Sequence, residues 1–278
     1  MTKPNHHIFA DGQLRRDEDT LRIDTVDDEI QYLQIENLDA IYLHGQIDFN
    51  TRSVGLLNDH GVTMHIFGWN DVYQGSYVPK RTHISGETIV KQVRAYDTHQ
   101  RRMKIARSIL SAAIHNMRAN TRYYNRRGYD FDATIEILTE QQEVLGDEDN
   151  INSLRGVEAT ARKAYYRCFD KILKDPFKLS KREYNPPTNE ANALVSFLNS
   201  MVYTACVSAI RKTALDPTVG FIHEPGERRF TLSLDIADIF KPILADRIIF
   251  RVVNRQQLST NDFESNLDGC LLTEDGRM

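Results

Sequence analysis

The chain has 278 residues, of which 41% are hydrophobic and 27% charged. This is the composition of an ordinary globular protein with one large or two small domains, and it excludes disorder as the main state. We find no run close to the roughly 18 apolar residues of a membrane helix, and the N-terminus lacks the apolar block of a signal peptide. Three distant cysteines, Cys168, Cys206 and Cys270, do not suggest a disulfide framework. We therefore expect a cytoplasmic protein.

The first part of the chain has the pattern of β structure. Short runs rich in β-branched and aromatic residues predict an N-terminal β domain over residues 1–85. Turn residues at 58–61 and 69–71 separate the runs, and residues 79–86 are typical of a linker. We predict strands at 21–23, 31–35, 40–44, 62–67 and 75–78, with a short helix at 51–57. We expect this domain to carry a homodimer contact, to which Tyr32, Tyr42 and Phe67 would supply apolar area.

After residue 85 the apolar spacing becomes helical. It predicts a larger all-helical domain over residues 86–278, so the fold class is α+β. We expect a long amphipathic helix through Val93 and Met117, further helices at about 133–145, 152–174, 188–213 and 232–253, and a closing hairpin with Asp-Gly turns at 266–276.

The positive charge is concentrated in one segment. Residues 91–127 contain a single acid, Asp97, and carry a net charge of +9, whereas the whole chain has a net charge of −4. A basic element in an acidic chain indicates a polyanion such as duplex DNA, although a solvated helix face would give the same pattern. The ten candidate phosphate contacts are Lys91, Arg94, Arg101, Arg102, Lys104, Arg107, Arg118, Arg122, Arg126 and Arg127.

Two predicted helices carry acids where apolar residues are expected. Glu158 fills a vacant place in the apolar stripe of the 152–174 helix, and a carboxylate there needs a compensating cation. In the last helix, Asp235, Asp238 and Asp246 share a face, and Pro242 cannot donate to the carbonyl of Asp238. The alternatives are a buried Glu paired with an Arg, and a solvated acidic face.

An apolar run, residues 220–222, delivers His223 just before a Glu-Pro-Gly loop. A lone His is usually structural. Together, however, Glu158, His223 and Asp238 would offer two carboxylates and one imidazole, a set that suits Mg²⁺ or Mn²⁺ with open, water-filled positions. The sequence has no P-loop, dinucleotide-binding or nucleophile-elbow motif.

Ordered motifs along nearly the whole chain resemble those of the CRISPR-associated integrases of spacer acquisition, the Cas1 family, in the form found with subtype I-B systems. They are FADGQLRR (9–16), IENLDAIY (35–42), GQIDFN (45–50), YQGSY (73–77), YYNRRG (123–128), RGVE (155–158), NAL (192–194), GFIH (220–223) and SLDIADIFKP (233–242). Each is weak alone, but the ordered set is specific.

The resemblance implies a homodimer that assembles with a Cas2 dimer and inserts short duplex DNA into the CRISPR array. It implies a metal site of Glu158, His223 and Asp238, with Asp235 close by as a fourth catalytic residue. Two features depart from the family pattern: Ala159 replaces a common Gly, and the sequence stops at Met278, which leads us to expect a truncated C-terminal domain. A metal-dependent nuclease acting on branched DNA in repair, and a non-catalytic DNA-binding scaffold, stay open as alternatives.

Overall fold

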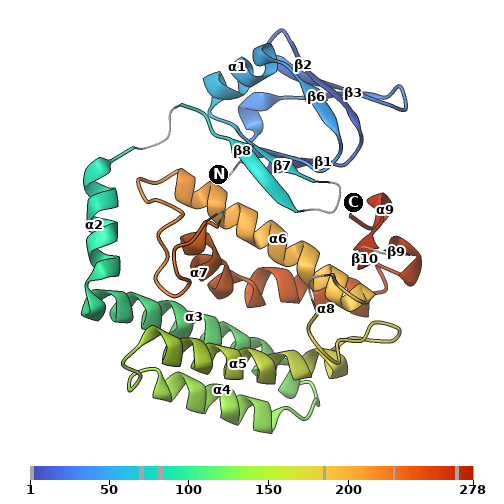
Figure 1. The fold of residues 1–278 in the computed structure, drawn as a ribbon. Coiled ribbons are helices and arrows are strands. Elements are labelled where there is room, and N and C mark those ends of the chain that lie inside the picture. Colours follow the sequence, from blue (N-terminus) through green and yellow to red (C-terminus); the bar gives the residue numbers. More distant parts are fainter. Residues whose placement is uncertain are drawn as a thin grey trace. The chain divides into compact units, whose positions relative to one another are not determined.

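The computed structural model describes residues 3–68, 72–80, 84–183, 186–227, 229–266 and 269–277. The chain divides into two compact units (Figure 1). The first contains Met1–Ile84 with Arg211–Thr213 and Arg277–Met278, and the second contains Ser85–Ile210 with Ala214–Gly276. The expected turns at 69–71 and at Asp268, and residues 81–83 of the expected linker, lie outside the described residues.

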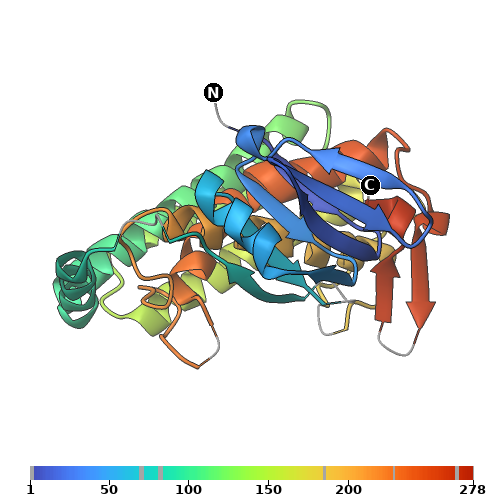
Figure 2. The same ribbon diagram turned by 90° about the horizontal axis from the view of Figure 1, so that it is seen from above.

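The first unit contains two four-stranded sheets, ordered β1-β5-β7-β8 and β4-β3-β2-β6. Its strands are drawn in dark blue to teal in Figure 2. Ile41 and Leu43 alternate with Tyr42 along β5, and they join a core that also contains Leu56 of helix α1. The elements are β1 (Asn5–Ile8), β2 (Gly12–Asp17), β3 (Thr20–Thr25), β4 (Ile30–Leu33), η1 (Ile35–Asn37), β5 (Ala40–Leu43), β6 (Ile47–Phe49), α1 (Thr51–His60), β7 (Thr63–Phe67) and β8 (Tyr73–Tyr77).

Three of these strands, β1, β2 and β6, have no predicted counterpart. Strands β1 and β2 carry one apolar residue each, and β6 is only three residues long. In β2 only Leu14 is buried, between exposed or half-buried polar neighbours. Strand β1 pairs with β5, and β2 pairs with both β3 and β6. A local apolar pattern cannot predict pairing between segments that are distant in sequence.

The second unit is mainly helical, as predicted. Its hairpin differs from the one expected at 266–276: the strands are Phe263–Asn266 and Gly269–Leu272, and the expected turn at Asp275-Gly276 lies in a short helix, Glu274–Arg277. Its elements are α2 (Gly86–Asp97), α3 (His99–Asn125), α4 (Asp132–Val144), α5 (Ile151–Ile172), α6 (Glu190–Arg211), α7 (Thr231–Phe240), the π-helix η2 (Pro242–Asp246), α8 (Arg247–Asn254), η3 (Thr260–Asp262), β9 (Phe263–Asn266), β10 (Gly269–Leu272) and α9 (Glu274–Arg277). The predicted basic helix is thus two helices that meet at Thr98, and the predicted last helix is three segments, with a π turn at Pro242.

Helices α3, α4 and α5 lie side by side (Figure 1) and share one core. The predicted stripe of α5 faces it: Leu154, Ala161 and Tyr165 are buried, and the ring of Phe169 packs edge-on against Phe250 of α8. Burial of this face fixes the rotation of α5 about its own axis. The direction of the Glu158 side chain follows from that rotation.

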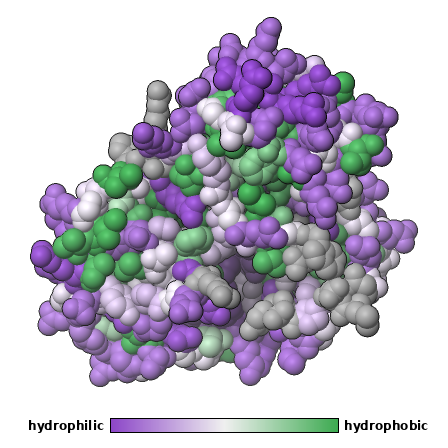
Figure 3. Space-filling model, turned by 45° about the horizontal axis from the view of Figure 1, so that its top comes forward, coloured by the Kyte–Doolittle hydropathy of each residue, from purple (hydrophilic) through white to green (hydrophobic). Residues whose placement is uncertain are grey.

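Helix α6 corrects the expectation that no stretch is apolar enough to cross a membrane. By length and composition Glu190–Arg211 would suffice, but half of its most apolar window is buried in the structure. One such helix is weak support for a membrane span, because the core helix of a folded domain meets the same test. The face seen in Figure 3 is mostly hydrophilic, with apolar side chains in separate patches.

Candidate metal centre and nucleic-acid interface

Glu158 of α5 and Asp238 of α7 meet at one cation. The guanidinium of Arg162, four residues after Glu158, donates to Glu158 Oε1 at 2.8 Å and lies 3.2 Å from Asp238 Oδ1. Nζ of Lys241 lies 2.6 Å from the same Asp238 oxygen. Two helices remote in sequence therefore bring two carboxylates and two cations together.

Asp238 is buried, with 4% of its surface exposed. Burial opposes its ionisation, but Arg162 and Lys241 outweigh it, so the pKa of Asp238 lies below its ordinary value. For Arg162, burial works against the charge while Asp238 and Glu158 favour it, and the pKa rises well above its ordinary value. Both groups are therefore charged at neutral pH. The solvated-face alternative is wrong for these acids, since Asp235, Asp238 and Asp246 are all buried.

The loop before α7 is organised by Asp235, which is fully buried. Its Oδ2 accepts from the backbone N–H groups of Phe221 and Ile222, and its Oδ1 contacts both the backbone N–H and the Nδ1 of His223 at 3.0 and 2.7 Å. Gly220 permits this approach, because a Cβ there would stand 2.8 Å from the backbone of Thr231. Asp235 thus fixes the direction of the imidazole.

The hydrogen bond to Asp235 raises the pKa of His223, burial opposes it, and the charges of Asp238 and Glu158 raise it further. With Nδ1 held by Asp235, Nε2 is the nitrogen left for a metal ion, and a carboxylate behind a ligating His is a common supporting arrangement.

The donor chemistry of Glu158, Asp238 and His223 fits Mg²⁺ or Mn²⁺. In the part of the chain that the structure describes, however, no three His, Cys, Asp or Glu side chains stand ready to hold a metal ion. In this structure the guanidinium of Arg162 contacts both carboxylates. Glu158, Asp238 and His223 are the residues that would hold a divalent ion.

The ten predicted phosphate contacts fall into two groups. Four have partners in the protein: Lys91 pairs with Glu87, Arg102 with Glu224 and the Phe221 carbonyl, Arg107 with the Glu148 carbonyl, and Arg118 with Thr139. Arg102 thereby braces the loop of His223. The other six have exposed side chains that make no ion pair or hydrogen bond with any described residue, although the Arg127 guanidinium lies over the ring of Tyr123. They are Arg94, Arg101, Lys104, Arg122, Arg126 and Arg127.

Sequence reasoning missed Arg162, Lys241 and the role of Asp246. Arg162 could have been found, because it stands four residues after Glu158 on the same helix face. Asp246 does not join the other acids. It is buried beside Tyr165, and burial raises its pKa to about 7. The π turn between Pro242 and Asp246 alters the helical register, so a count of regular turns misplaces it.

Comparison with known proteins decides the family. Residues 6–278 match the family model of CRISPR associated protein Cas1. The chain belongs to the Cas1 family. It is 67% identical over 278 residues to the CRISPR-associated endonuclease Cas1 of Haloferax volcanii, a match that covers 100% of this chain and 84% of the relative.

Solved structures agree on the fold. A Cas1 protein from Thermotoga maritima superposes with a TM-score of 0.88 and 33% identity, covering 99% of this chain and 86% of that one. A Cas6-RT-Cas1–Cas2 complex contains a chain with a TM-score of 0.84 and 21% identity, covering 100% of this chain and 31% of that one, which shows a shared fold. The α+β fold class and the resemblance found in the sequence are thus confirmed.

Proposed function

We propose that this Cas1 chain is a metal-dependent DNA endonuclease and integrase of CRISPR adaptation that inserts short duplex DNA into the CRISPR array. The observation that carries the proposal is that α5 and α7 bring Glu158 and Asp238 to the same guanidinium, while Asp235 of α7 holds His223, in a member of this family. The Haloferax volcanii relative, which is named a Cas1 endonuclease, supports the same chemistry.

The reaction is phosphoryl transfer. The 3'-hydroxyl of the incoming DNA attacks a phosphodiester of the array, a new O–P bond forms, and the P–O bond to the displaced 3'-oxygen breaks. When bound, Mg²⁺ or Mn²⁺ would neutralise charge on the reacting phosphate. Glu158, Asp238 and His223 would hold the ion, and Asp235 would keep the imidazole oriented. Lys241, whose Nζ lies 2.6 Å from Asp238 Oδ1, would add positive charge near the reacting phosphate.

The six exposed basic residues, together with the paired Arg102, Arg107, Arg118 and Lys91 nearby, would hold the duplex by its phosphates and so fix position more than sequence. Double-stranded DNA, a Cas2 dimer and a second copy of the chain are the proposed partners, acting in the cytoplasm where the array lies.

The homodimer contact expected in the first unit needs revision. Tyr42 and Phe67 are buried and cannot supply it, whereas Tyr32, Ile30 and Val26 are 56%, 52% and 70% exposed at the edge strand β4 and the adjoining turn. We propose this edge as the contact. A monomeric mass for a folded sample at micromolar concentration would contradict it.

The test is strand transfer of labelled 3'-hydroxyl DNA in Mn²⁺ by Glu158→Ala, His223→Ala and Asp238→Ala, with circular dichroism as the folding control. Each substitution should remove most of the activity while duplex binding persists, because the basic helices are separate elements. Near-normal activity in a folded variant would remove that residue from the site. Hydrolysis without transfer would favour the repair nuclease, and duplex binding without either reaction would favour the scaffold.

A further inference from the structure

Helix α2 buries a polar side chain and leaves apolar ones exposed. Gln92 is the buried residue of this helix, whereas Val90 and Val93 are about half exposed. A surface helix normally turns its apolar residues inward, so this is the reverse of the usual pattern. Burying an amide costs free energy unless hydrogen bonds replace those it made with water. The partners of Gln92 therefore explain where α2 lies.

The amide of Gln92 bonds to the backbone of one segment. Its Nε2 donates to the carbonyls of Asp216 and Val219, both at 2.9 Å, and its Oε1 accepts from the N–H of Asp216 at 2.8 Å. These residues begin the 216–224 loop, which carries His223 near its other end. Gln92 thus fixes the start of the His223 loop against α2.

The far end of the same loop is also held by α2. Tyr96, one turn further along this helix, donates its hydroxyl to Glu224 Oε2 at 2.6 Å. Arg102 of α3 lies 2.6 Å from the other oxygen of Glu224, and its guanidinium lies over the ring of Tyr96, 4.2 Å from the ring centre. Glu224, the residue after His223, is therefore held near the corner where α2 and α3 meet (Figure 1).

The loop is held from two sides. On one side, the carboxylate of Asp235 in α7 accepts from the N–H groups of residues 221–223. On the other, Ala95 and Tyr96 of α2 pack against the apolar cluster that contains Phe221. Asp235 fixes the direction of the imidazole, and α2 fixes the two ends of the loop. A displacement of α2 would carry both ends with it.

We propose that α2 positions the imidazole of His223 by holding both ends of its loop, through Gln92 at the start and through Tyr96 and Glu224 at the end. These three are positioning residues, because they act through His223 and not on the reacting atoms. The catalytic part of the proposal rests on the proposed function. Misplacing a reacting group by about 1 Å can cost about a hundredfold in rate, so loss of this contact should lower the rate of strand transfer and leave DNA binding intact.

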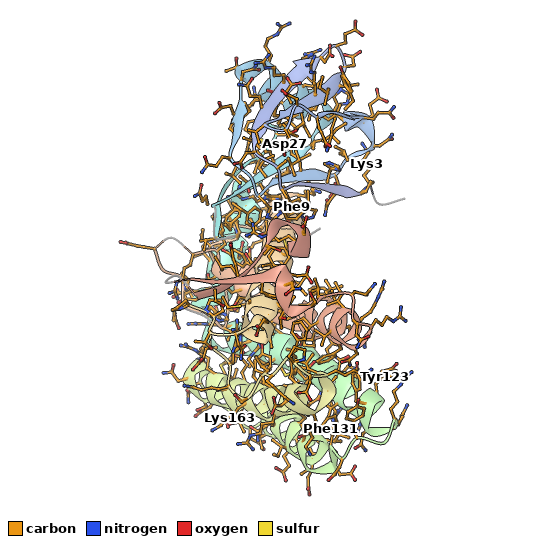
Figure 4. The ribbon with its side chains drawn as sticks, turned by 90° about the vertical axis from the view of Figure 1, so that its right-hand side faces the viewer. Lys3, Phe9, Asp27, Tyr123, Phe131 and Lys163 are labelled. Carbon is orange, nitrogen blue, oxygen red and sulfur yellow. The ribbon has the colours of Figure 1, made fainter. Side chains whose placement is uncertain are left out.

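The first experiment measures amide hydrogen exchange without DNA or metal. Gln92→Leu removes the hydrogen bonds and leaves their backbone partners unsatisfied, so the amides of residues 221–223 should exchange at least about tenfold faster. Reference amides are those of α5 around Lys163, which lies on the outside of the helical unit (Figure 4). Gln100→Leu, the same change on the exposed first turn of α3, is the matched control. Equal acceleration at the reference amides would show that Gln92 supports only global stability, and would overturn the proposal.

The second experiment measures strand transfer in Mn²⁺ by variants that circular dichroism shows to be folded. Tyr96→Phe and Glu224→Ala should each lower the rate at saturating DNA about ten- to a hundredfold, the range for a group that orients a metal ligand. The DNA concentration that gives half the maximal rate should not change. Glu224→Gln keeps a hydrogen-bonding group for both helices and should recover most of the rate. Glu227→Ala removes an exposed carboxylate from the same connection and is the control.

An unchanged rate with a higher DNA requirement would contradict a positioning role, and so would a rate that Glu224→Gln does not recover. The two experiments also separate this proposal from the proposed function. If the wild type transfers no strand, the integrase proposal fails, and the exchange of residues 221–223 still decides whether α2 holds the loop. If the wild type transfers strands and the α2 variants match it in both rate and exchange, only the role of α2 fails.

Discussion

We predict that Arg162→Met lowers the stability of the metal-free protein and strengthens its binding of Mn²⁺. Its guanidinium is shared between Glu158 and Asp238 at 2.8 and 3.2 Å. Removing one partner of a buried ion pair costs about 3–5 kcal/mol. Glu158 keeps some exposure and Asp238 keeps Lys241, so we expect the lower end, about 3 kcal/mol, without metal. This corresponds to a melting temperature lower by about 9 °C.

Mn²⁺ should reverse this loss. At about 100 times its Kd a ligand stabilises the folded state by about 2.7 kcal/mol, which nearly restores the variant. In the wild type, an ion held by Glu158 and Asp238 would compete with the guanidinium that contacts both, so Arg162→Met should bind Mn²⁺ at least about tenfold more tightly, a difference of roughly 1.4 kcal/mol. Titration calorimetry and thermal melts with and without Mn²⁺ measure both quantities, and Lys163→Met is the control. Equal Mn²⁺ affinities for variant and wild type would refute the reasoning.

Other parts of the second unit give further predictions. Burial raises the pKa of Asp246 to about 7, so the folded chain keeps a proton that the unfolded chain loses near pH 4. The free energy of unfolding therefore falls by up to about 4 kcal/mol as the pH rises from about 4 to about 7. Asp246→Asn should lack this slope in denaturant unfolding at pH 5 and 8, and an equal slope would show that burial is not the cause. Asp235→Asn should lower stability by about 3 kcal/mol, because its carboxylate holds several loop groups, and a melt unchanged from wild type would argue otherwise. His223 should titrate above its ordinary pKa in NMR and move back towards it in Asp235→Asn; the stability from this pair is present at low pH and lost as pH rises through the folded pKa. Arg101→Ala with Lys104→Ala should reduce the salt slope of duplex binding by about 1.8 units, whereas an unchanged slope would remove both from the interface.

The fold class could be predicted because the apolar period changes from two to 3.6 near residue 85, and this change follows from local geometry. The stripe of α5 was predicted correctly because its core neighbours impose that spacing. Strands β1, β2 and β6 could not be found in this way, since they depend on partners distant in sequence.

The candidate site was predictable in its acids but not in its cations. Glu158 and Asp238 stood out because carboxylates at buried positions need an explanation. The explanation visible in the structure is Arg162, and its bridge to Asp238 requires α5 and α7 to pack together, which sequence spacing does not reveal. The roles of Arg102 and Asp235 in holding the His223 loop likewise depend on tertiary contacts.

The π turn at Pro242–Asp246 sets the rotation of α8 relative to α7 by its length. The N–H of Asp246 bonds to the carbonyl of Lys241, five residues back, so this turn contains one residue more than a regular α-turn. Asp238 precedes the turn, and Phe250, which packs edge-on against Phe169 in the core, follows it. Deleting one residue would rotate α8 by about 100° and turn Phe250 out of that core. The acidic helix α7 and the core helix α8 therefore depend on the number of residues between them as well as on their own side chains.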